Sequence, residues 1–338
     1  MRSQQIKTNM RFLGLALLFL AAGSRARAQQ DLIPVKAELI TRAIAKLPLV
    51  IAYDHGLYKK YGLDVKLWMP PGEYPGAIEI GGNQPMENPD FSVDGGTPMM
   101  VSIVTNAHAP KRVMLATMDC AVRFQIIGQK GIKSLEDLKG KRLGISGEGA
   151  MTSFVARLFA KRMGWNYYQD ISVLSNGHRT TDLQAGLVDA FIADDRYYAT
   201  AKQAGFPILA DTVDWKTAIA GSSVRVERTW LQNPRNQEAA RRFLKATLEG
   251  IAMFHRNRED ALRIMAKYHG IKDREVAGTI YDQGKNMPRK PYPCYEGIKN
   301  TMELFDSNEM RKHKQQDFFD DSLMKELDKS GFIDALYK

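Results

Sequence analysis

The sequence predicts an α/β fold with mostly parallel strands, and three observations support this prediction. Strand-like and helix-like segments alternate along residues 35–209, as they do in βαβ units. Helix-like segments dominate after residue 233, where no further strand is expected. The 338 residues are 44% hydrophobic and 25% charged, which is ordinary for globular proteins and excludes a mainly disordered, collagenous or coiled-coil chain. This length allows either one large domain or two lobes, with a sizeable core to bury.

The expected strands are short runs rich in β-branched and apolar residues. Residues 63–68 (LDVKLW) are typical, because apolar and polar side chains alternate as they do in a half-buried strand. In chain order, the expected strands are residues 35–40, 63–68, 91–93, 113–116, 123–127, 142–145, 171–174, 188–193 and 207–209.

The expected helices begin and end at residues suited to those positions. Thr97 followed by a proline predicts an N-cap and a helix that continues to residue 104. The helix after residues 146–152 is expected to end at Met163, because Gly164 suits a C-terminal cap. The remaining helix-like segments are residues 47–62, 134–138, 180–185, 197–204, 240–254, 261–265, 275–281, 295–305 and 323–327.

Residues 1–28 have the pattern of an export signal. They carry five basic residues and no acid, an apolar run over 12–22, and an Ala-Arg-Ala triplet at 26–28. The apolar run is shorter than the roughly 20 residues that a bilayer span requires. Half of the net charge of +10 therefore belongs to a segment expected to be removed. We expect a periplasmic protein that begins at Gln29, and no nucleic-acid partner, because the remaining charge forms no basic run.

Cysteine and histidine patterns provide no sign of a metal or catalytic centre. The six histidines lack metal-ligand spacing, and no nucleophile–base pair is visible, so we expect no metal, no cofactor and no catalytic residue. Cys120 and Cys294 lie 174 positions apart, and nothing in the sequence supports a bond between them. We expect two separate buried thiols.

Four segments in consistent order resemble a known family. They are AYDHGLYKKYGLDV at 52–65, GIKSLEDLKGKRLGISGEGAMTSF at 131–154, DLQAGLVDAFIADDRYYA at 182–199 and DSLMKELDKSGFIDALY at 321–337. The chain resembles ABC-transporter solute-binding proteins of the nitrate/sulfonate/taurine and thiamine-pyrimidine-precursor type. The resemblance implies a type II periplasmic binding protein fold, with two α/β lobes joined by a two-segment hinge and a helical C-terminal third. Matched to this pattern, lobe one is residues 29–119 plus 218–338, and lobe two is residues 120–217.

The candidate ligand-binding residues lie in turns that follow strands, where ligands of open α/β sheets bind. The turn at 146–152 combines Gly149, which permits close approach, with free N–H groups at the start of a helix, although it may equally be a plain turn. Arg42 offers a planar fork for an anion, or is a solvated surface side chain. One aspartate of the 194–195 pair is expected to cap a helix, a role that suits Asp195, while the other faces the cleft. The candidates are Arg42, Gly96, Thr97, Ser146, Gly149, Ala150, Met151, Thr152, Asp194 and Tyr197.

The resemblance implies a monomeric periplasmic protein that captures a small ligand and delivers it to an inner-membrane ABC permease with its ATPase. We expect the ligand to be a small anionic or heteroaromatic organic compound, and Gly149→Val or Arg42→Ala to weaken binding without unfolding the protein. One alternative is an enzyme like the thiamine-pyrimidine synthases, although the Cys-rich motif of those enzymes is absent here. Another is a periplasmic ligand sensor.

Overall fold

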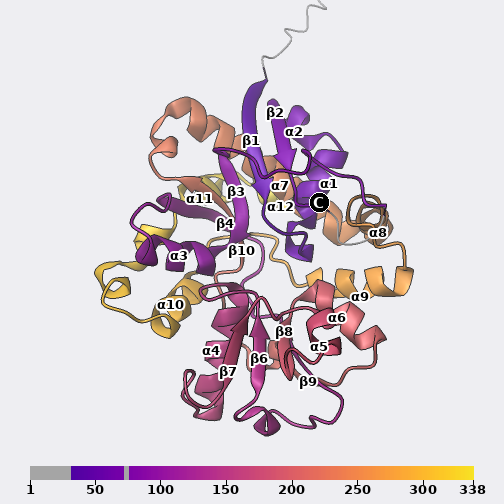
Figure 1. The fold of residues 1–338 in the computed structure, drawn as a ribbon. Coiled ribbons are helices and arrows are strands. Elements are labelled where there is room, and N and C mark those ends of the chain that lie inside the picture. Colours follow the sequence, from indigo (N-terminus) through magenta and orange to yellow (C-terminus); the bar gives the residue numbers. More distant parts are fainter. Residues whose placement is uncertain (1–31, 72–75) are drawn as a thin grey trace, which may run out of the picture.

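The computed structural model describes residues 32–71 and 76–338, which form two α/β lobes, each built on one five-stranded sheet (Figure 1). The predicted export signal lies outside the described residues. Strands of the first sheet fall within residues 33–117 and 222–227, and those of the second within 125–211. The two sheets therefore take separate parts of the chain, whereas the exact lobe boundaries stay a prediction.

The first sheet is mixed. In spatial order its strands are β2 (Leu63–Trp68), β1 (Ile33–Leu39), β3 (Phe91–Gly95), β10 (Ser222–Glu227) and β4 (Arg112–Thr117). β1 pairs in parallel with β2 and β3, whereas β10 is antiparallel to both β3 and β4. β10 was not predicted from the sequence, and it lies inside the sheet rather than at its edge.

The second sheet repeats this arrangement. In spatial order its strands are β7 (Ser172–Ser175), β6 (Arg142–Ile145), β8 (Ala190–Ala193), β5 (Gln125–Gly128) and β9 (Ile208–Asp211). β6 is parallel to β7 and β8, and β5 is antiparallel to β8 and β9. In each sheet, therefore, four strands run one way and one runs against them, which confirms the prediction of mostly parallel strands.

The antiparallel strand of each lobe is the first strand after the chain crosses from the other lobe. β5 follows the first crossing and β10 follows the second. The parallel strands β1, β3, β6 and β8 point their carboxyl ends toward the other lobe, so a strand that enters from that side has to run in the opposite direction. This topology brings the carboxyl ends of these four strands and the two crossings together between the lobes.

Most helices agree with the sequence pattern in order. The expected helix at 134–138 is instead a short 3-10 helix over Glu136–Leu138, residues 47–62 form two helices, and the last helix was not expected. The α-helices are α1 (Leu47–Asp54), α2 (Leu57–Lys60), α3 (Gly96–Thr105), α4 (Met151–Met163), α5 (Thr180–Gln184), α6 (Asp195–Gln203), α7 (Pro234–Arg256), α8 (Arg258–Ile264), α9 (Arg274–Gly284), α10 (Tyr295–Leu304), α11 (Ser322–Lys329) and α12 (Phe332–Ala335). Gly164 ends α4 with φ +69°, as predicted. Thr97 is not the N-cap of α3: the helix begins at Gly96, and Gly95 occupies the cap.

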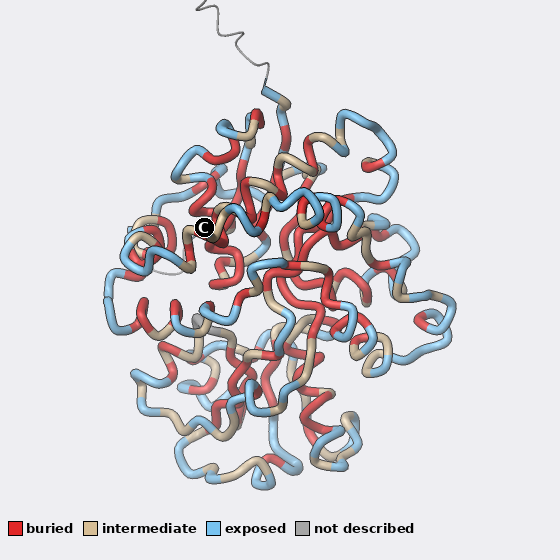
Figure 2. Tube along the Cα trace, turned by 180° about the vertical axis from the view of Figure 1, so that it is seen from behind, coloured by how far each residue is buried: buried red, intermediate tan, exposed pale blue. Residues whose placement is uncertain are grey.

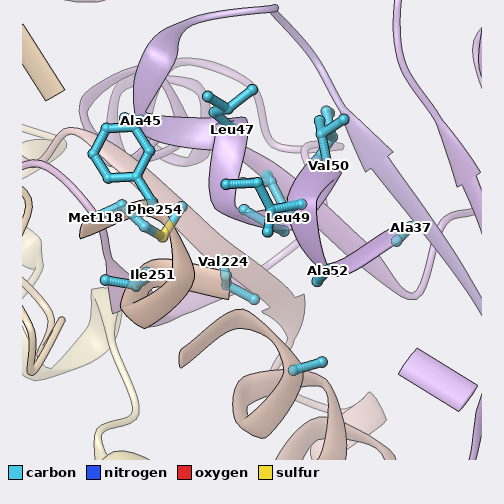
Figure 3. Close-up of a cluster of buried hydrophobic side chains, with 14 of the residues drawn as sticks. Ala37, Ala45, Leu47, Leu49, Val50, Ala52, Met118, Val224, Ile251 and Phe254 are labelled. Carbon is cyan, nitrogen blue, oxygen red and sulfur yellow. The ribbon is translucent and has the colours of Figure 1, made fainter. Parts of the chain in front are cut away.

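The main core lies in lobe one, where α1 and the long helix α7 pack together against the first sheet. Figure 3 shows side chains of both helices gathered in one cluster, among them Leu47, Leu49, Ile251 and Phe254. A second core, around α4 and β6, fills lobe two. Figure 2 shows these buried segments inside both lobes, with exposed loops around them. Within residues 32–71 and 76–338, no helix combines the length and the apolar character needed to cross a membrane.

The two crossings form a paired hinge. Ala121 and Ala218 make an isolated antiparallel bridge. On either side of it, the Val122 N–H donates to the Thr217 carbonyl at 2.9 Å and the Ile219 N–H donates to the Cys120 carbonyl at 2.9 Å. The crossings therefore behave as a short two-stranded ribbon.

The expectation of two separate thiols is wrong, because Cys120 and Cys294 form a disulfide. Their Cα atoms lie 5.5 Å apart, within the usual bridging range. The chain before α10 runs alongside the first crossing, where the Thr117 N–H donates to the Pro291 carbonyl at 3.0 Å. Nothing in the sequence indicated a bond between two cysteines so far apart in the chain, but long-range packing brings them together. The disulfide fastens the first crossing to lobe one.

The lobes also touch on both sides of the hinge. On one side α6 packs on α9, and Ala199 of α6 belongs to the core cluster of lobe one (Figure 1). On the other side α4 packs on α3 and α10, and the Arg157 guanidinium lies 4.8 Å from the ring centre of Phe305. These contacts enclose the space between the two sheets.

Candidate functional site

A cavity of about 260 Å³ lies between the lobes, where the strand ends and the two crossings meet. Both lobes and the first crossing line it, and its wall combines apolar side chains with carboxyl, hydroxyl and guanidinium groups. The lining residues are Thr41, Ala43, Ile44, Ala45, Asp94, Pro98, Asp119, Arg123, Phe124, Ser146, Ala150, Met151, Thr152, His178, Ile192, Asp194, Tyr197, Ser222 and Gln283.

The first turn of α4 forms the centre of the lobe-two wall. Ala150 occupies the N-cap position, and no side chain there caps the helix. The Ser146 N–H donates to the Thr152 hydroxyl at 2.9 Å, and the two hydroxyl oxygens lie 2.7 Å apart. These bonds hold the turn against the helix start, where N–H groups and the helix dipole favour a ligand oxygen or an unprotonated ring nitrogen.

The end of β8 contributes the second part of the lobe-two wall. The Asp194 carboxylate lines the cavity and accepts a hydrogen bond from the Tyr197 N–H at 3.4 Å, at the start of α6. Asp194 therefore performs the capping expected of Asp195 while it also faces the cleft. The rings of Tyr197 and His178 meet edge to face, 5.4 Å between centres.

A buried network of charges supports the lobe-one wall. Lys46 is 1% exposed, and its Nζ lies 3.1 Å from Asp94 Oδ1 and 2.5 Å from the Thr41 hydroxyl. Arg225 reaches Asp94 Oδ2 at 3.9 Å and donates to the Gly95 carbonyl at 3.0 Å. Burial alone would raise the pKa of Asp94, but the charges of Lys46 and Arg225 outweigh it and hold that pKa below its usual range. Asp94 therefore carries a compensated charge.

Asp119 lies at the start of the first crossing and differs from Asp94. Its carboxylate accepts a hydrogen bond from the Ser222 N–H at the start of β10, where the second crossing ends. Burial raises the pKa of Asp119 to about 6, and the positive charges of Arg123 and Lys46 oppose this rise only in part. A side chain at Gly221 would collide with the Asp119 carboxylate, so a glycine there lets the acid join the two crossings.

Arg123 is the one guanidinium among the described residues that line the cavity. It belongs to the end of the first crossing, just before β5, and donates to the Gln283 carbonyl at the end of α9. This bond runs from lobe two to lobe one, so Arg123 takes part in the contact between the lobes as well as in the cavity wall.

The structure brings six of the ten predicted site residues into the cavity wall: Ser146, Ala150, Met151, Thr152, Asp194 and Tyr197. Arg42 instead points into lobe one, where it donates to the carbonyls of Pro70 and Tyr268 and is 6% exposed. We therefore expect Arg42→Ala to affect stability rather than to remove a ligand contact.

The other three predicted residues also lie off the cavity. Gly96 is buried at the start of α3, and the Thr97 hydroxyl lies 2.9 Å from that of Thr301 in the interior. Gly149 lies at the contact between the lobes. Its φ is +78°, and a Cβ there would stand 2.8 Å from Val101 of α3. Gly149 therefore permits close approach, but to lobe one rather than to a ligand in the cavity.

Sequence reasoning missed Lys46, Asp94, Asp119 and Arg123. Asp94 stands near the end of β3 and Asp119 near the end of β4. Asp194 was predicted as a site residue because it stands at the end of a strand in the same way. No turn motif marks Asp94 or Asp119, however, and their partners lie far away in the chain.

The cavity can hold a small molecule through hydrogen bonds and charge, with apolar side chains against its faces. Its wall contains acids, hydroxyls and one imidazole. Among the residues that the structure describes, no group of three or more His, Cys, Asp or Glu side chains could hold a metal ion.

Comparison with known proteins adds a family and a fold. A model described as NMT1/THI5 like matches residues 44–261, more than half of the chain. No curated protein matches the chain.

Three solved structures illustrate the fold. The periplasmic aliphatic sulphonate-binding protein SsuA from Escherichia coli has a TM-score of 0.60 and 20% identity, over 80% of this chain and 85% of that chain. The periplasmic nitrate-binding protein NrtA from Synechocystis PCC 6803 has a TM-score of 0.66 and 13% identity, over 89% of each chain. The desulfurization enzyme DSZB has a TM-score of 0.57 and 13% identity, over 88% of this chain and 99% of that chain. The predicted periplasmic binding protein fold is therefore confirmed.

Proposed function

Because the chain belongs to the NMT1/THI5-like family, we propose that it is a periplasmic solute-binding protein that captures a small organic ligand and delivers it to an ABC importer. The observation that carries this proposal is the cavity itself, which is lined by both lobes and by the first crossing between them. Structural neighbours named as periplasmic sulphonate-binding and nitrate-binding proteins support the same role. A membrane permease and its ATPase are the partners that this function requires.

The mechanism is a shift between open and closed states. A ligand held by the first turn of α4 on one side and by the lobe-one wall on the other has its full set of contacts only when the lobes are closed. Binding then favours the closed state by the difference in affinity between the two states. The crossings, paired by hydrogen bonds around Ala121 and Ala218, are the segment about which the lobes would turn.

The apolar faces of the cavity favour a flat organic compound over a compact inorganic anion. Ile44 and Pro98 come from lobe one, and Phe124, Met151 and Ile192 come from lobe two. Of the two ligand classes that the sequence predicts, anionic or heteroaromatic, these surfaces favour a heteroaromatic ring.

The function can be tested by screening small organic compounds for an increase in the unfolding midpoint of the protein. A compound present at 100 times its dissociation constant should add about 2.7 kcal/mol of stability. Small-angle X-ray scattering should then record a smaller radius of gyration with that compound. A stabilising compound that leaves the radius unchanged would contradict closure.

The same samples distinguish a binding protein from an enzyme, a possibility raised by the likeness to a desulfurization enzyme. Mass spectrometry should recover the bound compound unchanged after prolonged incubation, and its conversion would favour the enzyme. A sensor would bind in the same way, so transport is tested separately, by uptake of the compound in cells with and without the gene.

A further inference from the structure

The walls of the cavity carry more negative than positive groups. Asp94, Asp119 and Asp194 line it, and Arg123 is the one Arg or Lys among the described lining residues. The acids come from three different segments: the end of β3, the first crossing and the end of β8. An anionic ligand would therefore meet three carboxyl groups from different directions.

Two of these acids already have a structural role. Asp94 is compensated by Lys46 and Arg225, at 3.1 and 3.9 Å. Asp194 accepts a hydrogen bond from the Tyr197 N–H at the start of α6. A ligand would have to compete with these partners to bind either acid fully.

Asp119 differs because its described hydrogen-bond partners are neutral backbone N–H groups. Its Oδ1 accepts a hydrogen bond from the Ser222 N–H. No ion pair in the described part of the chain includes Asp119, although the charges of Arg123 and Lys46 act on its carboxyl group and partly oppose the rise in its pKa that burial causes. A partly buried acid without a paired cation is stabilised by a donor or a positive charge brought into the cavity.

The opposite wall has the complementary character. The first turn of α4 presents helix N–H groups, and the hydroxyls of Ser146 and Thr152 lie beside it. These groups suit the acceptor side of a ligand. The cavity therefore offers a carboxylate acceptor at the hinge and, at the first turn of α4, donors from lobe two.

We propose that Asp119 determines specificity by receiving a cationic or N–H-donating edge of the ligand, such as an amidinium or a protonated amine, whose other edge faces the first turn of α4. This inference rests on the proposed function and names the ligand class of the same site. Asp119 also accepts a hydrogen bond from Ser222 at the start of β10, so the acid that would hold the ligand joins the start of the first crossing to the end of the second.

Four compounds of nearly the same shape test this proposal: benzamidinium, benzamide, benzoate and benzenesulfonate. Their dissociation constants are measured by calorimetry with the full chain at pH 7.5, and binding is checked by the unfolding midpoint. Benzamidinium should bind at least tenfold more tightly than benzoate or benzenesulfonate. Asp119→Asn should weaken benzamidinium at least tenfold and benzamide less than threefold, because only the cation loses a charge partner.

Asp64→Asn is the matched control, because it removes one carboxylate from an exposed position of β2, away from the cavity. It should leave all four constants unchanged within twofold. A cooperative unfolding transition of Asp119→Asn, together with retained benzamide binding, shows that the variant is folded. If Asp119→Asn fails to fold, the dissociation constants of the four compounds for the unmodified chain test the proposal on their own.

The outcomes separate the two proposals. Tighter binding of benzoate or benzenesulfonate than of benzamidinium would overturn the assignment of Asp119 and leave the solute-binding function intact. Equal loss of benzamidinium in Asp119→Asn and Asp64→Asn would also overturn it. Failure of all four compounds to bind would contradict the proposed capture of small ring compounds, and the inference with it.

Discussion

The two walls of the cavity are built from different chemistry. The lobe-one wall has buried charges that are already paired, Lys46 with Asp94 and Arg225 behind them. The lobe-two wall has the start of α4, two hydroxyls and the Asp194 carboxylate. Changes in the first wall should therefore act mainly on stability, and changes in the second mainly on binding and closure. Asp119 stands at the boundary, where the first crossing leaves lobe one.

The largest expected effect concerns the bond that fastens the first crossing to lobe one. Replacing Cys120 and Cys294 together by serine should lower the free energy of unfolding by about 4 kcal/mol, because the disulfide closes a long loop. Denaturant unfolding of the double variant measures this, and the unmodified protein with a reducing agent should show a similar loss. A change under about 1 kcal/mol would mean that the crossing is held by packing alone.

The next effect tests whether the lobe-one wall depends on its paired charges. Lys46→Met should cost about 3 kcal/mol, because it leaves Asp94 without its nearest cation in a buried position. Lys60→Met is the matched control: it breaks a pair with Glu249 whose lysine is 55% exposed, and should cost less than about 1 kcal/mol. Equal losses in the two variants would contradict the special role of the buried network.

Replacing Asp119 should stabilise the protein, whereas replacing Lys46 should destabilise it. Its pKa is raised to about 6 from an ordinary value of 3.8, so the folded protein holds this proton more tightly than the unfolded chain does. Ionisation therefore costs stability as the pH rises from about 4 through 6, and the cost stays constant above that. Asp119→Asn should raise the free energy of unfolding by about 3 kcal/mol at pH 7.5 and leave it nearly unchanged at pH 4.

Urea unfolding of both proteins at the two pH values measures this difference. The charged neighbours Lys46, Arg123 and Asp94 remain in both proteins, so their contributions largely cancel. A variant less stable than the unmodified protein at pH 7.5 would show that Asp119 is well compensated without a ligand.

The smallest effect concerns the lobe-two side. Gly149→Val should weaken benzamidinium binding about tenfold, equivalent to about 1.4 kcal/mol, because a side chain would press on Val101 and resist closure. Gly147→Val, in the same turn, meets no atom within 4 Å of its Cβ and should bind nearly as well as the unmodified protein. Similar affinities of the two variants would argue against closure at this contact.

The difference between the walls also explains what the sequence could predict. The turn at 146–152 is a local strand-to-helix pattern, and its placement in the cavity wall could be predicted from neighbouring residues alone. The lobe-one wall depends on Lys46, Asp94 and Arg225, which come together from three distant segments. Arg42 was misleading for the same reason: the carbonyl of Tyr268, 226 positions away, holds it inside lobe one.

Strand β10 and the disulfide were also missed from the sequence, because both depend on contacts between distant segments. β10 (Ser222–Glu227) is a short strand with only two apolar side chains, Val224 and Val226, and it is stabilised by β3 and β4 on either side. The Cys120–Cys294 bond forms because the chain before α10 lies along the first crossing. Helices with clear end signals, such as α4, were predicted closely because those signals are local.

A crystal structure of the protein with benzamidinium tests the two-walled site most directly. We expect one molecule between the lobes, with an amidinium nitrogen within hydrogen-bond distance of the Asp119 carboxylate and the far side of the ring against the first turn of α4. Benzamidinium bound to one lobe only, or with its amidinium directed away from Asp119, would contradict a site built from these two walls.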